Sequence, residues 1–495
     1  MSEGDKKQST HAWNEETSVA ESLPEGQPGS LRSKSVLIVA YHFPPAAGQG
    51  LPGTQRAVKL TRYLPQFGWT PIVLTVKEAS YPYYIERDSQ SLEVLPKSLV
   101  VSRTGITSIL EAVLKLKTSA SRKVRSAVSS SAAAGYRRKV SPRIRSSNGE
   151  ARGRLQAIKD FITDMFQIPD EVAGWIIPAT FRGRSLIKRN SIDAIIATGR
   201  PWSSLVIGSL LSQLTGVPLV ADFRDPWMTN PFRARHSRFK NFMDARLERF
   251  VVQKSELVIA NTDSLRQEFV DRYPVMTSEQ FVCIPNGFDP QEIKQSLEGH
   301  AVSHSDEVFT LVHAGFLYGK RDPAVLVDAV RMLIDAEKMS PGSLRVILVG
   351  PRELPYSLRE YIAAKGLTES IEIVDAVPFL ESLRFVADSS VALLLQPDTM
   401  TQVPSKLFEN IGMGKMTIAI ADRGSATEKL FADHDLGFFA DASSSETVAH
   451  AIHAAYNAWR SNEGPLEVAE GVREKFDIQT RVEQIARHLD SLAGT

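Results

Sequence analysis

Cysteine is nearly absent from this chain: Cys283 is the single cysteine among 495 residues, so no disulfide can form within the chain. It lies in the apolar run FVCI at residues 281–284, which predicts a buried strand and disfavours a catalytic thiol. Chains without disulfides are typical of reducing compartments. The cysteine content therefore favours a cytosolic protein.

Long hydrophobic runs are missing as well. No uninterrupted apolar stretch approaches the roughly 20 residues that span a bilayer, and the N-terminus is polar and acidic, unlike a secretory signal. The formal net charge is only +1, so the molecule as a whole is not a polyanion binder. We expect the protein in the cytoplasm, with peripheral attachment to the inner face of the plasma membrane left open.

Several catalytic signatures are also absent. The sequence has no HxH or CxxC spacing for zinc, no glycine-rich GK[ST] loop for phosphates and no GxSxG turn for a serine nucleophile. We therefore expect no metal and no cofactor. The chemistry is expected to depend on main-chain amides and cationic side chains.

What the sequence does contain is an alternation of short apolar strands with helical patterns, in both halves. The expected strands are residues 36–40, 71–76, 192–198, 218–222, 256–260 and 281–284, then 308–314, 344–349, 371–374, 391–395 and 416–421. Repeated βα units of this kind predict an α/β fold of two doubly wound domains that face each other across a cleft.

Composition sets the expected domain boundaries. Residues 1–33 are polar without apolar periodicity, which is typical of a disordered tail. The remaining expected segments are an N-terminal domain at 34–290, a polar linker at 291–307, a C-terminal domain at 308–475 and a final helix at 476–495. That helix has an apolar face that needs a partner surface, for which the N-terminal domain is the candidate.

A basic insertion interrupts the first domain at about residues 115–154. From Lys115 to Arg145 the chain has ten Lys and Arg residues and no Asp or Glu. One interpretation is docking on anionic lipid headgroups; the other is a solvated loop without a partner. Nucleic acid is not expected, because Tyr136 is the only aromatic residue of that stretch.

The segment VPSKLFENIGMGK at residues 403–415 carries the most specific signal. Pro404 suits the first turn of a helix, so the N–H groups of Ser405, Lys406 and Leu407 are expected to face an anion. Glu409 would lie where its carboxylate accepts ribose hydroxyls. The arrangement suits a nucleotide sugar, although an ordinary core helix with solvated charges is the alternative.

Other candidate residues follow the predicted strands, where ligands of doubly wound sheets bind. They lie in the segments YHFPPAAGQG from residue 41, TGRPW from 198, DFRDPW from 222 and HAGFLYGKRD from 313. Glycines in such loops allow main-chain amides to approach a phosphate, and Lys320 with Arg321 would add cations. The competing interpretations are a tight turn at the glycines, pairing of Asp222 or Asp225 with Arg224, and a core position for Trp202 or His313.

Taken in order, these segments resemble the retaining glycosyltransferases of family four. The resemblance covers residues from about 35 to the end, and its phrases are LIVAYHFPPAAGQGLPGTQRAVKLTRYLPQFGW, PDEVAGWIIPA, IIATGRPWSS, VADFRDPW, IPNGFD, VHAGFLYGKRDP and VPSKLFENIGMGK. It looks most like the subgroup that builds bacterial polysaccharides. It implies the GT-B fold of two Rossmann-like domains and metal-independent hexosyl transfer from a nucleoside diphosphate sugar to a glycan or lipid-linked glycan hydroxyl, with retention.

The resemblance also assigns roles. Gly48 and Gly50 match the loop near the donor phosphates, and Arg321 falls where the family keeps a diphosphate lysine. Phe316 replaces a usual arginine, and Thr401 stands where many members have a glutamate. The candidates are Arg321, Lys320, Asp222, Arg224 and Asp225 as catalytic residues, Gly48, Gly50, Gly315, Asn286, Ser405, Lys406, Leu407 and Glu409 on the donor side, and His42, Arg200 and Trp202 on the acceptor side.

Two alternative functions remain open from the sequence. A nucleotide-sugar epimerase of similar architecture would need a buried acid/base pair that acts on the sugar ring. A non-catalytic nucleotide-sugar-binding protein is the other alternative, because Phe316 and Thr401 depart from the family pattern. The loops FRDPW and TGRPW favour transfer, since they are expected on the acceptor side.

Overall fold

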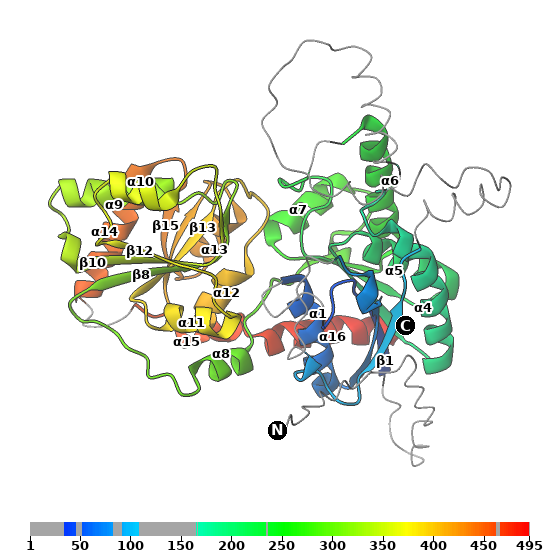
Figure 1. The fold of residues 1–495 in the computed structure, drawn as a ribbon. Coiled ribbons are helices and arrows are strands. Elements are labelled where there is room, and N and C mark those ends of the chain that lie inside the picture. Colours follow the sequence, from blue (N-terminus) through cyan, green and yellow to red (C-terminus); the bar gives the residue numbers. More distant parts are fainter. Residues whose placement is uncertain are drawn as a thin grey trace, which may run out of the picture.

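The computed structural model describes residues 34–45, 52–82, 92–107, 165, 167–233, 236–461 and 466–494. The expected disordered tail, the basic insertion, Gly48 and Gly50 lie outside the described residues. Figure 1 shows two α/β domains beside each other, joined near α8 and α15. In the part of the chain that is described, no helix is both long and apolar enough to cross a bilayer.

The N-terminal domain is built on a seven-stranded parallel sheet with the order β3-β2-β1-β4-β5-β6-β7. Its strands are β1 (Lys34–Val39), β2 (Trp69–Val76), β3 (Val100–Thr104), β4 (Ala194–Gly199), β5 (Leu219–Phe223), β6 (Leu257–Ala260) and β7 (Phe281–Cys283). Its helices are α1 (Pro52–Tyr63), η1 (Leu64–Phe67), η2 (Glu78–Ser80), η4 (Ala173–Trp175), α4 (Ile176–Asn190), α5 (Ser203–Thr215), α6 (Arg238–Lys254), α7 (Asp263–Arg272) and η5 (Ser278–Gln280).

The C-terminal domain has a six-stranded parallel sheet with the order β12-β10-β8-β13-β14-β15. Its strands are β8 (Phe309–Ala314), β10 (Leu344–Val349), β12 (Ile371–Val374), β13 (Val391–Gln396), β14 (Thr417–Ala421) and β15 (Gly437–Asp441), with the small pair β9 (Leu317–Tyr318) and β11 (Arg352–Glu353). Its helices are α9 (Ala324–Asp335), η6 (Pro341–Ser343), α10 (Leu358–Ala364), α11 (Phe379–Ala387), α12 (Ser405–Gly412), α13 (Ala426–Asp433), α14 (Ser445–Ser461) and α15 (Glu470–Lys475). Together the two sheets confirm the predicted fold class.

Each sheet is covered on both faces, which explains why its strands read as continuous apolar runs. In the N-terminal domain, α4, α5, α6 and α7 contribute to one core cluster. Helices α1 and α16 (Ile478–Ala493) contribute to another, together with β1. Residues after the strands are therefore left at one edge of the sheet, where the loops form a site.

Several elements differ from the expectations. Strands β3 and β15 were not predicted; both are edge strands and both are partly exposed. The sequence of β3 is VVSRT, polar in its last three residues, and that of β15 is GFFAD, with only three apolar residues between a glycine and an aspartate. The segment 291–307, expected as a linker, begins inside helix α8 (Pro290–Leu297). Asp289 caps that helix by accepting a hydrogen bond from the Gln291 N–H, and α8 packs against α11 and α12.

The chain crosses between the domains twice, and the two crossings lie side by side. The Phe288 N–H donates to the Phe476 carbonyl at 3.1 Å, and the Ile478 N–H donates to the Phe288 carbonyl at 2.9 Å. Beyond the second crossing, α16 lies against α1 and η1. Asp490 on α16 accepts a bond from Trp69 Nε1 at 3.1 Å. The C-terminal helix thus belongs spatially to the N-terminal domain.

Candidate functional site

Helix α12 presents its N-terminus at the site because its other side is anchored in the core. Leu407, Phe408 and Ile411 are at most 1 % exposed and pack in one cluster with residues of β13 and β14. Pro404 is the N-cap in extended conformation. The Leu407 N–H already donates to the Pro404 carbonyl at 3.2 Å, which corrects the expectation that it faces an anion. The first-turn amides of Ser405 and Lys406 have no acceptor within the helix.

Lys406 extends over Gly315, which follows β8. A Cβ at Gly315 would lie 2.8 Å from Lys406 Cε and 2.9 Å from His313 Nε2, so only glycine leaves room for both side chains. Lys406 Nζ has no hydrogen bond or ion pair among the described residues. Burial and the nearby Arg321 lower the pKa of Lys406, whereas Glu409 raises it. The Lys406 ammonium group is therefore not neutralised by an ion pair within the described part of the chain.

His313 is a second buried polar group of this cluster. Its Nδ1 lies 3.2 Å from the Leu393 carbonyl, which only accepts hydrogen bonds, so Nδ1 carries the proton. Nε2 is then an unprotonated acceptor, and it has no partner within the described part of the chain. Burial, Lys406 and Arg321 lower the pKa of His313 to about 3. The imidazole is neutral at physiological pH.

Arg321 completes the cluster after β9. It donates through Nη2 to Gln396 Oε1 at 2.8 Å and lies over the Tyr318 ring, 5.2 Å from its centroid. Gln396 is the last residue of β13, and its role was not predicted from the sequence. The Arg321 Nε atom is buried without a partner in the described structure. Two cations and a neutral imidazole thus converge beside the N-terminus of α12.

Lys320 does not join this cluster. Its side chain is 73 % exposed and forms an ion pair with Asp398 at 3.2 Å. Phe316, at the position of the family's usual arginine, is partly exposed and packs against Tyr318. The cationic contribution of this loop therefore comes from Arg321.

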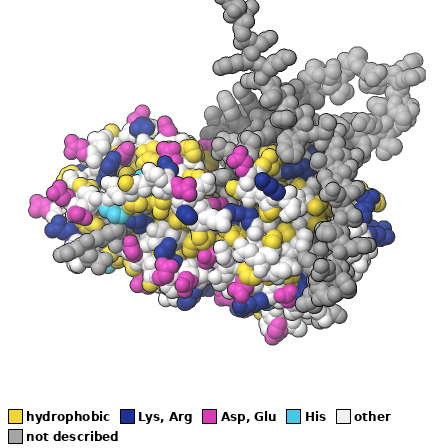
Figure 2. Space-filling model, turned by 90° about the horizontal axis from the view of Figure 1, so that it is seen from below, with side chains coloured by type: hydrophobic (Ala, Val, Ile, Leu, Met, Phe, Trp, Pro, Cys, Tyr) yellow, Lys and Arg dark blue, Asp and Glu magenta, His cyan; other side chains and the backbone are white. Residues whose placement is uncertain are grey.

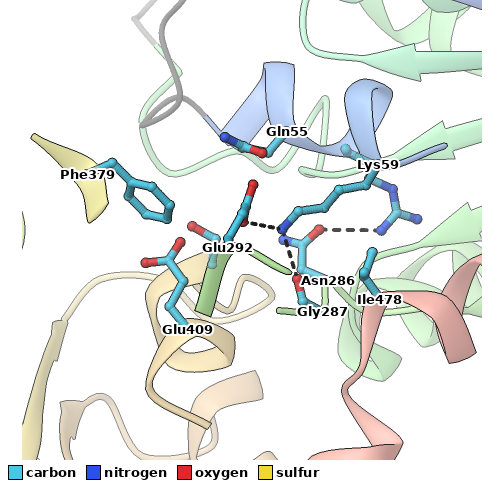
Figure 3. Close-up of a pocket in the computed structure, with 10 residues that line it drawn as sticks. Gln55, Lys59, Asn286, Gly287, Glu292, Phe379, Glu409 and Ile478 are labelled. Carbon is cyan, nitrogen blue, oxygen red and sulfur yellow. Dashed lines mark hydrogen bonds and ion pairs between the residues drawn. The ribbon is translucent and has the colours of Figure 1, made fainter. Parts of the chain in front are cut away.

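A pocket lies between the two domains, next to the α12 N-terminus. Figure 3 shows Glu409 pointing into it from α12, while Lys59 reaches in from α1 toward Glu292. The Lys59 and Glu292 side chains are 3.4 Å apart. Burial, Asp289 and Glu409 all raise the pKa of Glu292, and Lys59 opposes them. The pocket is lined by Gln55, Arg56, Lys59, Asn286, Gly287, Glu292, Phe379, Ser405, Glu409 and Ile478.

The acceptor-side candidates His42 and Arg200 gather with Arg224, which was expected among the catalytic residues, at the edge of the N-terminal sheet. Arg224 donates through Nη2 to the Arg200 carbonyl at 2.6 Å. A Cβ at Gly53 would lie 3.1 Å from Arg224 and 3.3 Å from His42. Gly53, Arg224 and His42 therefore lie side by side. Burial, Arg224 and Arg200 lower the pKa of His42 to about 3. The charge of this group therefore comes from Arg200 and Arg224, because His42 is neutral at physiological pH.

Asp222 is not presented to the cleft. It is 2 % exposed and pairs with Arg56, with Arg56 Nε donating to Oδ2 at 2.9 Å and Nη2 lying 2.8 Å from Oδ1. Arg56 also reaches the Ile284 carbonyl and Asn286 Oδ1, each at 3.4 Å. This placement argues against the catalytic assignment of Asp222. It favours the competing interpretation of a structural pair, with Arg56 as the partner in place of Arg224. Arg56 was missed, and its only signal was a cation next to the apolar face of a predicted helix.

Asp225 and Trp202 also take structural positions. Asp225 accepts a hydrogen bond from Gln402 Nε2, which links the N-terminal domain to the residues before α12. Trp202 is 7 % exposed and stacks on Trp227 with ring centroids 5.1 Å apart. Trp202 is therefore a core residue and not an acceptor contact. Among the described residues, no group of three or more His, Cys, Asp and Glu side chains is arranged to hold a metal ion.

Comparison with known proteins shows which sequences and folds this chain is similar to. The family model described as Glycosyltransferase Family 4 matches residues 140–292. A curated relative, D-inositol 3-phosphate glycosyltransferase of Streptosporangium roseum, is 25 % identical over 225 residues, which cover 43 % of this chain and 51 % of that protein. The chain thus matches about half the length of this relative.

Solved structures resemble nearly the whole chain. Anabaena Alr3699/HepE in complex with UDP has a TM-score of 0.56 at 16 % identity and covers 92 % of this chain and 100 % of its own. Sucrose-phosphate synthase of Thermosynechococcus elongatus has a TM-score of 0.56 at 13 % identity, with 93 % and 99 % covered. The chain therefore has the GT-B fold, and its resemblance to glycosyltransferase family four is confirmed over residues 140–292 by the family model.

Proposed function

We propose that this protein transfers a sugar from a nucleoside diphosphate sugar to an acceptor hydroxyl. One observation carries the proposal: Lys406 lies against His313 and Gly315 beside the first-turn amides of α12, and Arg321 is near enough to lower the pKa of both Lys406 and His313. Within the described part of the chain, Glu409 is the one carboxylate that raises the pKa of Lys406. A diphosphate supplies the missing charge and accepts hydrogen bonds from the first helical turn. Glu409 then lies where ribose hydroxyls can donate to its carboxylate.

The proposed reaction keeps the anomeric configuration. The bond between the anomeric carbon and the diphosphate oxygen breaks, and the acceptor oxygen bonds to the same face of that carbon. The acceptor proton passes to the leaving diphosphate oxygen, so no other group has to take it. Arg321, Lys406 and the amides of α12 stabilise the charge that develops on the diphosphate. His313 Nε2 accepts a hydrogen bond from a sugar hydroxyl or from Lys406.

The acceptor is proposed to enter beside Arg224, Arg200 and His42 on the N-terminal domain. A glycan or lipid-linked glycan is the proposed acceptor, a hexose the proposed sugar and bacterial polysaccharide synthesis the proposed setting. The cytoplasm is the proposed compartment, in keeping with the single cysteine, whose thiol pKa is raised to about 11 by burial. Turnover is proposed to need no added divalent cation, since side-chain cations and a helix N-terminus already face the diphosphate position.

Solved structures of similar fold support the proposal of a nucleotide-sugar donor. Alr3699/HepE was solved with UDP, with UDP and glucose, and with UDP-glucose. Each of these complexes pairs the same fold with a uridine nucleotide. The proposal carries a nucleoside diphosphate sugar over to this chain and leaves base and sugar to experiment.

A ligand panel tests the proposal first. UDP- and GDP-sugars are screened for thermal stabilisation, which rises with ligand concentration over Kd, and hits are titrated calorimetrically against wild type and Glu409→Ala. We expect one nucleotide class to bind, and Glu409→Ala to bind it at least tenfold more weakly. Failure of every nucleotide sugar to bind would remove the proposal.

Product analysis then separates the alternatives. Transfer yields a glycosylated acceptor and free nucleoside diphosphate, with retention read from the anomeric coupling constant in the NMR spectrum. An epimerised nucleotide sugar would identify the epimerase instead, and binding without turnover would identify a non-catalytic binding protein. Assays with and without EDTA test the proposed metal independence.

A further inference from the structure

Two helices of the N-terminal domain carry the same unusual surface. On α4, Ile177 and Phe181 are 62 % and 74 % exposed, and exposed Arg184 and Lys188 continue the same face at helical spacing. On α6, Phe242 is 54 % exposed and is followed by exposed Arg246 and Arg249. Each helix therefore presents an apolar group near its N-terminus and cations farther along.

Neither helix exposes a carboxylate. The sequence of α4 contains no Asp or Glu. The two acidic residues of α6, Asp244 and Glu248, are at most 1 % exposed. Asp244 is held by Lys240 and Arg233, and Glu248 by Arg272 and Tyr273. The outward charge of both helices is thus purely positive, whereas acidic and basic side chains are mixed over the C-terminal domain on the face shown in Figure 2.

The two surfaces belong to one side of the domain. Helix α5 packs against both α4 and α6 (Figure 1). Lys240, in the first turn of α6, donates through Nζ to the Gln167 and Pro169 carbonyls at 2.7 and 2.8 Å, and this segment leads into α4. Trp175, the N-cap of α4, donates to Thr104 at the end of β3. The apolar ends therefore lie toward the sheet edge that carries His42 and Arg224.

We propose that the outward faces of α4 and α6 dock this protein on an anionic lipid bilayer. Ile177, Phe181 and Phe242 enter the interfacial layer, and the cations behind them contact lipid phosphates. Charge complementarity favours a bilayer over a protein partner, because cations flank apolar groups with no carboxylate between them.

In this orientation the docking surface would bring the cleft close to a lipid-linked acceptor. The acceptor-side residues lie at the edge of the sheet from which both helices start, so a lipid-linked acceptor would meet the cleft without leaving the membrane. The docking surface is independent of the transfer chemistry, because vesicle binding is measured without donor. A failure of either idea therefore leaves the other standing.

Flotation of the full-length protein with vesicles tests the surface. Vesicles of phosphatidylcholine alone are compared with vesicles that contain about one-third phosphatidylglycerol, at low and high salt. We expect binding to the anionic vesicles only, and less of it in high salt. Arg184→Glu with Lys188→Glu should weaken binding about 25-fold or more, since each basic residue near the surface contributes about fivefold. The matched control is Lys338→Glu with Arg359→Glu, two exposed cations of the C-terminal domain.

Variants of the exposed apolar residues provide a second test of vesicle binding. Ile177→Ser with Phe181→Ser should weaken vesicle binding several-fold, whereas Val302→Ser with Met332→Ser, at exposed positions of the C-terminal part, should not. All variants are checked for unchanged Tm. Equal losses in the test and control variants would overturn the proposal. Equal binding to neutral vesicles would also overturn it, as would capture of an oligonucleotide by the wild type in place of vesicles.

Discussion

Arg321 and Lys320 are neighbours in sequence with different surroundings, and this difference is testable at the residue scale. Arg321 is partly buried and bonded to Gln396, so it is preorganised for a developing charge. Arg321→Ala should lower kcat roughly 100- to 1000-fold, as for loss of one such donor. Lys320→Ala should change kcat less than about threefold, because its ammonium is exposed and paired with Asp398. Similar losses in both variants would place Lys320 back in the site.

His313 makes stability depend on pH. Its folded pKa of about 3 lies below the ordinary value of 6.5, so the unfolded chain takes up the proton first as pH falls. The stabilisation is complete above about pH 6.5 and is lost as pH falls toward 3. Between pH 7 and pH 5 this residue alone should reduce the free energy of unfolding by about 2 kcal/mol.

Urea titrations at pH 7 and pH 5 measure this effect, with His313→Gln as the variant that cannot titrate. The difference between the two pH values should be smaller in His313→Gln by about 2 kcal/mol. Other groups that titrate in this range, such as Asp170 with its pKa raised to about 6 by burial, remain in both proteins and cancel. An identical pH dependence of both proteins would contradict the buried neutral imidazole.

At the scale of elements, the Arg56–Asp222 pair joins α1 to the end of β5. Both side chains are at most 5 % exposed, so removal of one partner leaves a buried charge without compensation. Asp222→Ala should therefore destabilise the protein by about 3–5 kcal/mol. The double variant Arg56→Met with Asp222→Leu should recover much of this loss, as apolar pairs replace buried ion pairs well. A stable Asp222→Ala protein with lost turnover would instead restore the catalytic role.

The sequence predicted elements better than it predicted side-chain partners. Central strands such as β1 and β13 are buried on both faces, so their apolar runs identify them without a structure. Pairs of side chains that are distant in the sequence produce no comparable local pattern. Nothing local indicates that Asp222 meets Arg56, 166 positions away, or that Gln396 orients Arg321. The cluster at α12 was predictable in part, because Lys406 and Glu409 occupy one short helix, with Pro404 as its N-cap.

At the scale of the whole molecule, motion of the two domains depends on the paired crossings. A Cβ at Gly287 would lie 2.5 Å from the Phe476 carbonyl oxygen and 3.1 Å from the Ile478 nitrogen, so the crossings touch through glycine. Gly287→Ala should push them apart and cost about 1–3 kcal/mol, as for other overpacked sites. It should also impair closure on the donor, because closure completes the site between the domains.

Small-angle scattering with and without nucleotide measures closure, and urea titration measures the stability change. Gly342→Ala is the matched control, since nothing lies within 4 Å of its Cβ position. We expect a nucleotide-dependent decrease of the radius of gyration in wild type and in Gly342→Ala, and a smaller decrease in Gly287→Ala. If Gly287→Ala closes as the wild type does, the crossings do not govern the motion. Other contacts between the domains, such as Gln402 with Asp225 and Thr262 with the Thr401 carbonyl, would then govern it.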